Sequence, residues 1–283
     1  LGDVYKRQPI KVSQAAQTHA GTYYLVDGEG WINASDLSTT DNRIEAVQKV
    51  LNEKYNNQER ISVYVKQLDT DRVAAINDEK SMYAASVAKL GVLYYAQERL
   101  SQKKLSLSDE YQYTSAVNGF PGAYDPDGSG KISKMPDDKN YSLENLLKAV
   151  AQNSDNVATN ILGYYVTNQY DKAFQKSVDK AAATSWNMDK KELTARAAGT
   201  LMEAVYRQNG DIITYLSSTD YDGERISKNI DVPVAHKIGD AYDFKHDVAI
   251  VYADSPFILS IFTDKEGYDK ITSIADDVYG ILK

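Results

Sequence analysis

The chain places strand-like segments near its two ends and helix-like segments between them, and this distribution restricts the fold more than any other feature. In residues 61–65 apolar side chains alternate as in a half-buried strand, and a turn leads to a second strand over residues 72–77. Three further strands are predicted over residues 232–238, 248–253 and 257–263. Strands from both ends can share one sheet only if the middle of the chain is an insert. The sequence therefore predicts an α+β fold, with an antiparallel sheet of about five strands, helices on both faces and an all-helical insert.

The segments outside the strands show the apolar spacing that indicates helices. From Arg43 onward, apolar side chains recur at helical intervals, and Ser142 is expected to cap the N-terminus of another helix. The other predicted helices cover residues 84–100, a segment from about residue 157, a segment after Thr194, and residues 268–282. Residues 118–140 are rich in glycine, proline and aspartate and are expected to form a loop.

The composition excludes several classes of function. The net charge is −8, from 32 Lys and Arg against 40 Asp and Glu, which argues against nucleic acid or an anionic membrane as a partner. The chain has no cysteine and only three scattered histidines, so we expect no metal and no cofactor. No apolar run approaches the roughly 18 residues that cross a bilayer. The acidic composition with 22 tyrosines favours an extracellular bacterial protein, secreted or associated with the cell wall, and we expect a monomer.

The first forty residues differ from the rest of the chain. Residues 1–8 show no periodicity that joins them to the neighbouring segment, and we expect them to be a remnant outside the fold. Residues 21–26 and 31–37, separated by an Asp-Gly-Glu-Gly turn, predict a short hairpin. Within residues 9–40 this hairpin resembles the tail of the SH3-like (GW-type) repeats that hold cell-wall polymers, and an ordinary hairpin or linker is the alternative. The main domain is expected to cover residues 41–283.

One helical segment carries a serine and a lysine that could do chemistry. Residues 82–96 contain Lys89 as their single charged residue, so the helix is expected to be buried and its lysine costly unless it has a role. Ser86 lies three positions earlier, on the same helical face. Desolvation favours the neutral amine, which can take a proton from a hydroxyl. Two other Ser-x-x-Lys pairs, Ser101/Lys104 and Ser177/Lys180, lie in polar stretches and are expected to be exposed.

Two further motifs occur in order along the chain. The tripeptide Ser154–Asn156 falls at a break between two predicted helices, where short polar side chains can project into a cleft. Lys237 begins a Lys-Ile-Gly sequence at the end of a strand, and on its own face it is flanked by small residues, which leaves room for a ligand. Taken alone, the first motif reads as a helix cap and the second as a strand-ending turn. The combination of the three elements is what points to a catalytic site.

This trio resembles the penicillin-recognising serine hydrolases, that is, class A β-lactamases and penicillin-binding DD-peptidases. The similarity of layout covers roughly residues 44–282 and implies a β-lactamase/transpeptidase-like fold. It implies that Ser86 attacks an amide carbonyl and becomes acylated, and that Lys89 takes the serine proton. It also implies that Ser154 relays a proton to the leaving nitrogen while Lys237 supplies positive charge beside it.

The resemblance also implies the residues that bind the substrate. Asn156 would hold a side-chain amide of the substrate, and Gly239 would leave space beside Lys237. The backbone N–H groups of Ser86 and Asp240 would form the oxyanion hole, which typically contributes several kcal/mol. The partner is then a β-lactam or a D-alanyl peptide of peptidoglycan.

Two departures from the family pattern affect these expectations. Ile238 stands where the family usually has a hydroxyl residue that binds the substrate carboxylate, so that carboxylate loses its usual partner or binds near Asp240. The family's Glu-x-x-x-Asn sequence is also missing between the second and third motifs, and Asp179 and Glu192 are the nearest substitutes, although neither has the right sequence context. We therefore expect acylation but slow release of the acyl group.

Several interpretations remain open from the sequence. The leading one is a serine hydrolase that forms an acyl-enzyme with β-lactams. The alternatives are a DD-carboxypeptidase that acts on peptidoglycan and a non-catalytic wall-binding protein with the same fold. Residues 125–132 imitate the first half of an EF-hand loop, but its twelfth position is Pro136, so a calcium site is not expected. His236 is expected to pack against the sheet rather than act as a base.

Overall fold

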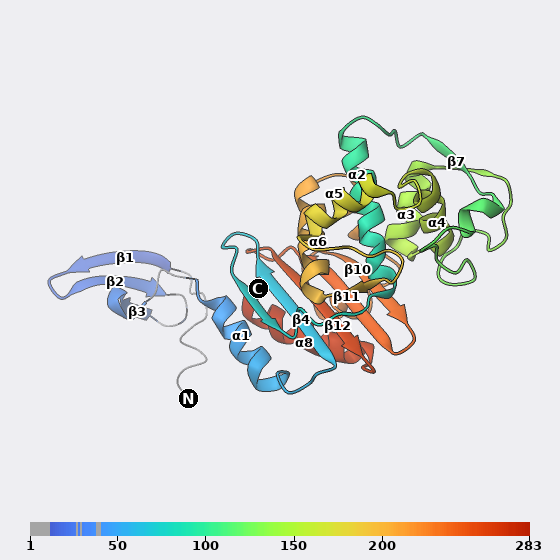
Figure 1. Cartoon of the computed structure of the whole chain (residues 1–283). Coiled ribbons are helices and arrows are strands. Elements are labelled where there is room, and N and C mark those ends of the chain that lie inside the picture. The colour runs from blue at the N-terminus through green and yellow to red at the C-terminus, as the bar shows by residue number, and fades with distance from the viewer. Residues whose placement is uncertain (1–11, 27, 29, 38–40) are drawn as a thin grey trace.

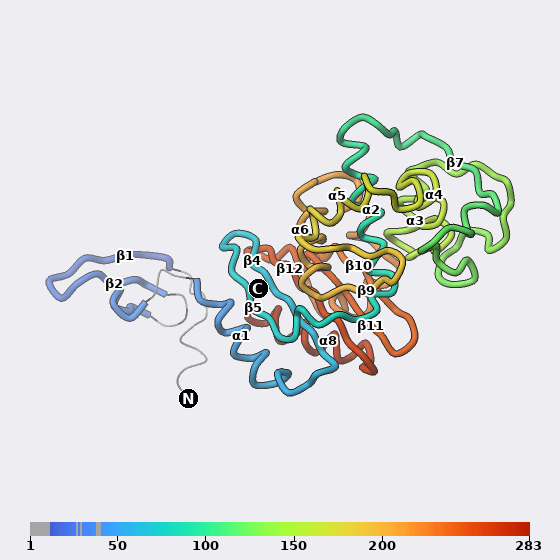
Figure 2. The backbone as a smooth tube through the Cα atoms, viewed as in Figure 1, coloured from blue at the N-terminus to red at the C-terminus, as the bar shows by residue number. Residues whose placement is uncertain are grey.

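The computed structural model describes residues 12–26, 28, 30–37 and 41–283. Its central feature is a five-stranded antiparallel sheet in the order β10-β11-β12-β4-β5. These strands are β4 (Ile61–Gln67), β5 (Val73–Ile76), β10 (Val234–Ala241), β11 (Phe244–Val251) and β12 (Phe257–Asp264). In Figure 2 the first of them, β4, lies beside β12 from the other end of the chain. The predicted sheet built from both ends is confirmed.

Eight α-helices and several short elements complete the described part of the chain. The helices are α1 (Arg43–Lys54), α2 (Leu90–Ser101), α3 (Leu143–Asn153), α4 (Asn156–Tyr165), α5 (Lys172–Ala182), α6 (Ala195–Gln208), α7 (Asp211–Leu216) and α8 (Tyr268–Leu282). The short strands are β6 (Met82–Tyr83), β7 (Glu110–Gln112), β8 (Asn140–Ser142) and β9 (Glu192–Leu193), and the 3₁₀ turns are η3 (Ala85–Lys89), η4 (Ser115–Asn118) and η5 (Ser227–Asn229). None of the helices in this part of the chain is long and apolar enough to cross a bilayer.

The sheet has a separate hydrophobic core on each face. On one face, α1 and α8 cover side chains such as Leu259 and Ile261; on the other, α6 covers Ile258 and Phe262 of the same strand. This alternation along β12 follows from the two-residue period of a strand. Figure 1 shows the remaining helices gathered into a body beside the sheet, which is the predicted insert. The insert is not all-helical as predicted, because β7 and β8 pair within it.

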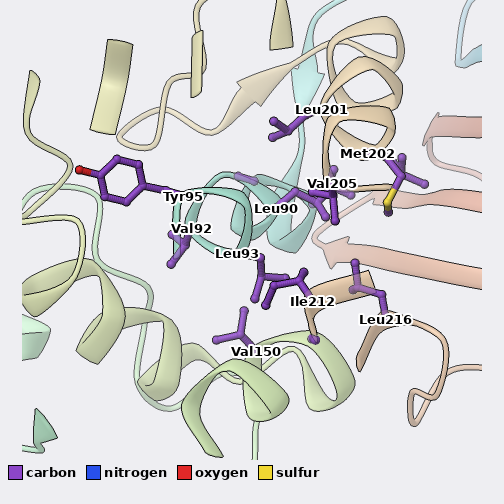
Figure 3. Close-up of a cluster of buried hydrophobic side chains, with 14 of the residues drawn as sticks. Leu90, Val92, Leu93, Tyr95, Val150, Leu201, Met202, Val205, Ile212 and Leu216 are labelled. Carbon is purple, nitrogen blue, oxygen red and sulfur yellow. The ribbon is translucent and has the colours of Figure 1, made fainter. Parts of the chain in front are cut away.

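The helical insert is organised around α2, which is buried along most of its length. Figure 3 shows Leu90 and Leu93 of α2 meeting Val150, Val205 and Ile212 from three other helices. The Trp186 indole packs on the start of the helix and donates from Nε1 to the Ala88 carbonyl at 3.1 Å. Because this core holds α2 rigidly, it also fixes the segment just before α2.

The N-terminal segment forms a small sheet of its own. The predicted hairpin is present as β2 (Gly21–Val26) and β3 (Gly30–Asn33), followed by the 3₁₀ turn η2 (Ala34–Asp36), and β1 (Val12–Thr18) pairs with β2 as a third strand that the sequence did not predict. Trp31 is 49% exposed on this sheet. The expectation for residues 1–8 lies outside the described residues, and the polymer-binding role stays a prediction.

Candidate active site

Ser86 lies in the 3₁₀ turn η3 rather than in the regular helix predicted over residues 84–100. The turn is held on one side by the Ala84 N–H, which donates to the Lys191 carbonyl at 2.7 Å. On the other side the Tyr124 hydroxyl donates to the Ala85 carbonyl at 3.2 Å. Ala85 has φ +49°, a left-handed conformation that is unfavourable for a residue with a Cβ. The serine therefore sits on a strained, externally fixed turn and is 7% exposed.

The Lys89 amine is fully buried next to the Ser154–Asn156 turn. Its Nζ donates to the Ser154 carbonyl and to Asn156 Oδ1, each at 2.6 Å, and lies 3.5 Å from Ser154 Oγ. Burial and the charge of Lys237 hold the Lys89 pKa well below its usual value. A neutral amine has two N–H bonds and one lone pair. With both N–H bonds used by these acceptors, the lone pair is free to take a proton.

The Ser154–Asn156 turn is built as the junction of two helices. Ser154 ends α3 in the left-handed conformation (φ +54°), and Asp155 caps α4 by accepting from the Ala158 N–H at 2.8 Å. Asp155 also accepts from the backbone N–H groups of Lys131 and Ile132, at 2.6 and 2.9 Å. The Ser154–Asn156 motif therefore does cap a helix, as its sequence alone suggests, but the capping residue is Asp155. It leaves Ser154 and Asn156 to face the site.

Asn156 is anchored by the loop that imitates an EF-hand. Its Nδ2 donates to the Asp125 carbonyl at 2.8 Å, and its backbone N–H donates to the Ser129 carbonyl, also at 2.8 Å. A Cβ at Gly128 would collide with the Asn156 amide, so only glycine permits this approach. The loop thus positions a site residue. Both ends of the Asn156 amide are engaged by the protein, and its predicted contact to a substrate amide stays a prediction.

Lys237 reaches the same turn from the sheet. Its Nζ donates to Ser154 Oγ at 2.8 Å and to the Ile238 carbonyl at 3.1 Å. Complete burial lowers the Lys237 pKa to about 7, although the charge of Asp247 opposes this effect. As predicted, Lys237 and Gly239 lie on the same face of β10. A Cβ on Gly239 would lie 2.6 Å from the Ala84 carbonyl, so glycine allows β10 to touch η3.

The backbone of Asp240 is oriented toward the free edge of the sheet. The two-residue turn 242–243 joins β10 to β11, so Ala241 and Phe244 form the hydrogen-bonded pair that closes the hairpin. In an antiparallel pair, every second residue of a strand forms backbone hydrogen bonds to its partner strand. Gly239 and Lys237 therefore also bond to β11, whereas the N–H of Asp240, between them and Ala241, points away from β11. Because β10 is an edge strand, that N–H is available to a ligand beside η3. This placement is compatible with the predicted oxyanion hole.

Three site residues were not predicted from the sequence. The Lys89 and Lys191 amines each lie 4.5 Å from the centre of the Tyr124 ring, and Lys191 donates to the Gly122 carbonyl at 3.0 Å. Arg225 is buried and pairs with the Asp240 carboxylate at 2.9 Å. Tyr124 is the one tyrosine of the loop predicted over residues 118–140, and the two cations occur in polar segments that read as exposed surface. No sequence signal marks either cation.

The carboxylates considered as substitutes for the missing Glu do not face the site. Asp179 accepts from the Trp186 N–H at 2.7 Å and from Gln175, and Glu192 is exposed on β9. His236 lies on the opposite face of β10 from Lys237, buried between Asp247 at 3.0 Å and Asp222 at 3.1 Å, and these carboxylates raise its pKa to about 9. It is held by ion pairs as well as by packing on the sheet.

Replacing Lys237 by methionine is expected to increase the stability of the fold at low pH. Its native pKa of about 7 lies below its ordinary value of 10.5, so the unfolded chain binds more protons between these values and wild-type stability rises with pH across this window. At about 1.4 kcal/mol per pH unit, the variant should gain at least ~1 kcal/mol at pH 6. The gain should shrink toward pH 10.5. Denaturant unfolding at several pH values measures this.

The control is Lys49→Met, which removes an exposed amine from α1. It should leave the pH dependence of stability unchanged. A Lys237→Met variant that follows the wild-type pH curve would show that the buried amine is not destabilised by its surroundings.

Taken together, the fold and the converging groups define a class. A five-stranded antiparallel sheet with helices on both faces is the β-lactamase/transpeptidase-like fold. In this chain Lys89, Ser154 and Lys237 converge between sheet and insert, beside the 3₁₀ turn η3 that carries Ser86. The chain belongs to the beta-lactamase enzyme family, whose sequence model (Beta-lactamase2) matches residues 42–282.

Solved structures share this fold at low sequence identity. PBP-A is 15% identical, with a TM-score of 0.68 over 84% of this chain and 95% of that one. The TLA-3 extended-spectrum β-lactamase is 17% identical, with a TM-score of 0.68 over 86% and 99%. A β-lactamase from Sphaerobacter thermophilus DSM 20745 is 15% identical, with a TM-score of 0.65 over 84% and 94%. No curated protein sequence matches the chain.

Proposed function

We propose that the chain is a serine hydrolase in which Ser86 is acylated by β-lactams or by related D-alanyl amides of peptidoglycan. The observation that carries this proposal is the convergence of two buried amines on one hydroxyl. Lys89 Nζ and Lys237 Nζ lie 3.5 and 2.8 Å from Ser154 Oγ, at the turn beside η3. A buried amine is expensive unless it has a partner or a role, and two together are more so.

The proposed reaction uses each group once. The neutral Lys89 amine takes the Ser86 hydroxyl proton as Oγ attacks the carbonyl carbon. The negative charge that develops on the carbonyl oxygen is stabilised by the N–H groups of Ser86 and Asp240. The carbon–nitrogen bond then breaks. Ser154, hydrogen-bonded to Lys237, gives its proton to the leaving nitrogen and recovers one from protonated Lys89, which returns to its neutral form. The product is an ester on Ser86.

The surroundings of Lys89 favour a penicillin-binding type of behaviour over fast hydrolysis. Its hydrogen-bond partners in the described part of the chain are a carbonyl, an amide and a hydroxyl, with no carboxylate among them. Fast release of an acyl group needs a base that activates water. One of the neighbouring folds was solved as a penicillin-G acyl-enzyme complex of a PBP-A mutant. We therefore propose acylation followed by slow release.

Intact-protein mass spectrometry after incubation with benzylpenicillin tests the proposal. Because ring opening expels no fragment, the protein should gain the mass of one benzylpenicillin molecule. The adduct should map to Ser86 and be absent from Ser86→Ala. Ser101→Ala, which changes the exposed Ser-x-x-Lys pair, is the matched control and should be labelled normally. A wild-type protein that neither gains this mass nor consumes the antibiotic would exclude the proposed function.

A further inference from the structure

The peptide unit that joins Ala85 to Ser86 carries one of the two proposed oxyanion donors. Its carbonyl belongs to Ala85 and its N–H to Ser86. Because the unit is planar and trans, the two groups point in opposite directions. In the described part of the chain the Ser86 N–H has no acceptor. The orientation of the Ala85 carbonyl therefore decides where this unused donor points.

Tyr124 holds that carbonyl from outside the turn. Its hydroxyl donates to the Ala85 carbonyl at 3.2 Å, and the residue is buried. Within η3 the hydrogen bonds follow the i→i+3 pattern, whose geometry is poorer than that of an α-helix. Ala85 is in addition strained, with φ +49°. The turn alone thus holds this peptide unit weakly, and the hydroxyl supplies the additional bond.

Tyr124 is itself fixed at its backbone and at its ring. Its N–H donates to Asn160 Oδ1 at 2.7 Å, and its carbonyl accepts from Asn160 Nδ2 at 2.8 Å. Asn160 lies one helical turn after Asn156 on α4. The amines of Lys89 and Lys191 each lie 4.5 Å from the centre of the Tyr124 ring. The hydroxyl is therefore a rigid support for the Ala85 carbonyl.

The sheet contacts the same turn through β10. The Cβ that Gly239 lacks would lie 2.6 Å from the Ala84 carbonyl and 3.3 Å from the Val87 backbone nitrogen. The Asp240 N–H, the second proposed oxyanion donor, follows directly along the strand. A substrate oxygen beside this contact can meet both donors only if the Ala85–Ser86 peptide unit keeps its N–H on the substrate side.

We infer that Tyr124 is a positioning residue for the oxyanion hole. Its hydroxyl holds the Ala85 carbonyl away from the substrate and so keeps the Ser86 N–H directed at the substrate oxygen. If the peptide unit turned over, a carbonyl would replace that donor and repel the negative charge that develops in the reaction. The inference rests on the proposed acylation of Ser86, in which Tyr124 neither touches the substrate nor transfers a proton.

Tyr124→Phe tests this inference, because it removes the hydroxyl and keeps the ring and its packing. The rate of Ser86 labelling is followed by intact mass over a range of benzylpenicillin concentrations. The maximal rate should fall about ten-fold, less than the roughly 10²–10³-fold cost of losing an oxyanion donor, because the Ser86 N–H remains but is held less well. The half-saturating concentration should stay within about two-fold of wild type, since the oxyanion forms only during the reaction.

Two further readouts separate orientation from a change in basicity. Phenylboronic acid forms a tetrahedral adduct with a serine hydroxyl and imitates the reaction intermediate, so it should bind Tyr124→Phe about ten-fold more weakly. The midpoint of the pH profile of labelling should not move, because the ring beside Lys89 is unchanged.

The matched control is Tyr113→Phe. Tyr113 is buried, and its hydroxyl also donates to a backbone carbonyl, that of Lys134, at 3.1 Å. The variant removes a hydrogen bond of the same kind elsewhere in the fold. It should match wild type in the maximal rate, the boronic acid affinity and the pH midpoint.

The outcomes separate this inference from the proposed function. A Tyr124→Phe variant with the wild-type maximal rate and boronic acid affinity would overturn the inference and leave acylation standing. An equal loss in Tyr113→Phe would do the same, as would a shifted pH midpoint, which would assign the Tyr124 hydroxyl to proton transfer. Wild-type protein that is not labelled at Ser86 would overturn the proposed function, and the inference with it.

Discussion

Replacement of Lys89 by methionine is expected to slow the acylation of Ser86 by about a hundred- to ten-thousand-fold, the usual contribution of a positioned general base. Methionine has a similar length and shape, but it has no lone pair that can take the serine proton at neutral pH. The hydrogen bonds to the Ser154 carbonyl and Asn156 Oδ1 are lost as well. The measurement is the rate of adduct formation at Ser86 under excess probe.

The same substitution should change how stability depends on pH. The Lys89 pKa is well below its usual value because the amine is buried and Lys237 lies nearby. The wild-type fold therefore loses stability as the pH falls from about 10.5 toward the lowered pKa. Lys89→Met lacks this loss, so its stability relative to wild type should increase toward acidic pH. A purely structural effect would not produce such a dependence.

Lys104→Met is the matched control for both measurements. Lys104 belongs to the exposed Ser101/Lys104 pair at the end of α2, and the change removes an amine of the same kind. Acylation and the pH curve should match wild type. Normal acylation of Lys89→Met would remove Lys89 from the proposed mechanism and transfer the role of base to Lys237 or Lys191.

Much of the fold could be predicted because its local signals agree with its tertiary structure. The period of two in the strands at both ends is the same pattern that divides the two cores of the sheet. Ser142, predicted as a helix cap, accepts from the Asn145 N–H at 3.3 Å. In these segments the side chains that determine local structure are also the ones that determine packing.

The backbone at the nucleophile could not be predicted because long-range contacts determine it. The apolar run from Ala84 predicts a regular helix, whereas residues 85–89 form a 3₁₀ turn. The difference arises where β6 pairs with β9, more than 100 residues later in the chain, and where Tyr124 binds the Ala85 carbonyl. Sequence periodicity carries no information on such contacts. The same limitation hid Lys191 and Arg225, since a charged side chain in a polar segment reads as solvent-exposed.

The second large effect is expected in the lifetime of the acyl-enzyme. An enzyme with an ordinary turnover of about 10 s⁻¹ releases its acyl group within about a second. If the missing base removes a factor of about 10² to 10⁴, the ester on Ser86 should persist for about ten seconds to about twenty minutes. This expectation rests on the absence of a Glu-x-x-x-Asn sequence. It is supported by the orientation of Asp155, whose carboxylate is used by three backbone N–H groups.

The lifetime is measured by removing free probe and following the adduct mass with time. This experiment does not depend on how fast the adduct forms. A water molecule must be deprotonated near the ester. Lys191, which burial makes less basic, has no role in the proposed acylation, and its amine lies over the same Tyr124 ring as the Lys89 amine. Lys191→Met should therefore lengthen the lifetime of the adduct, and Lys190→Met, at the adjacent exposed position, is its control. Loss of the wild-type adduct within about a second would show that an efficient base is present and that the chain behaves as a true β-lactamase.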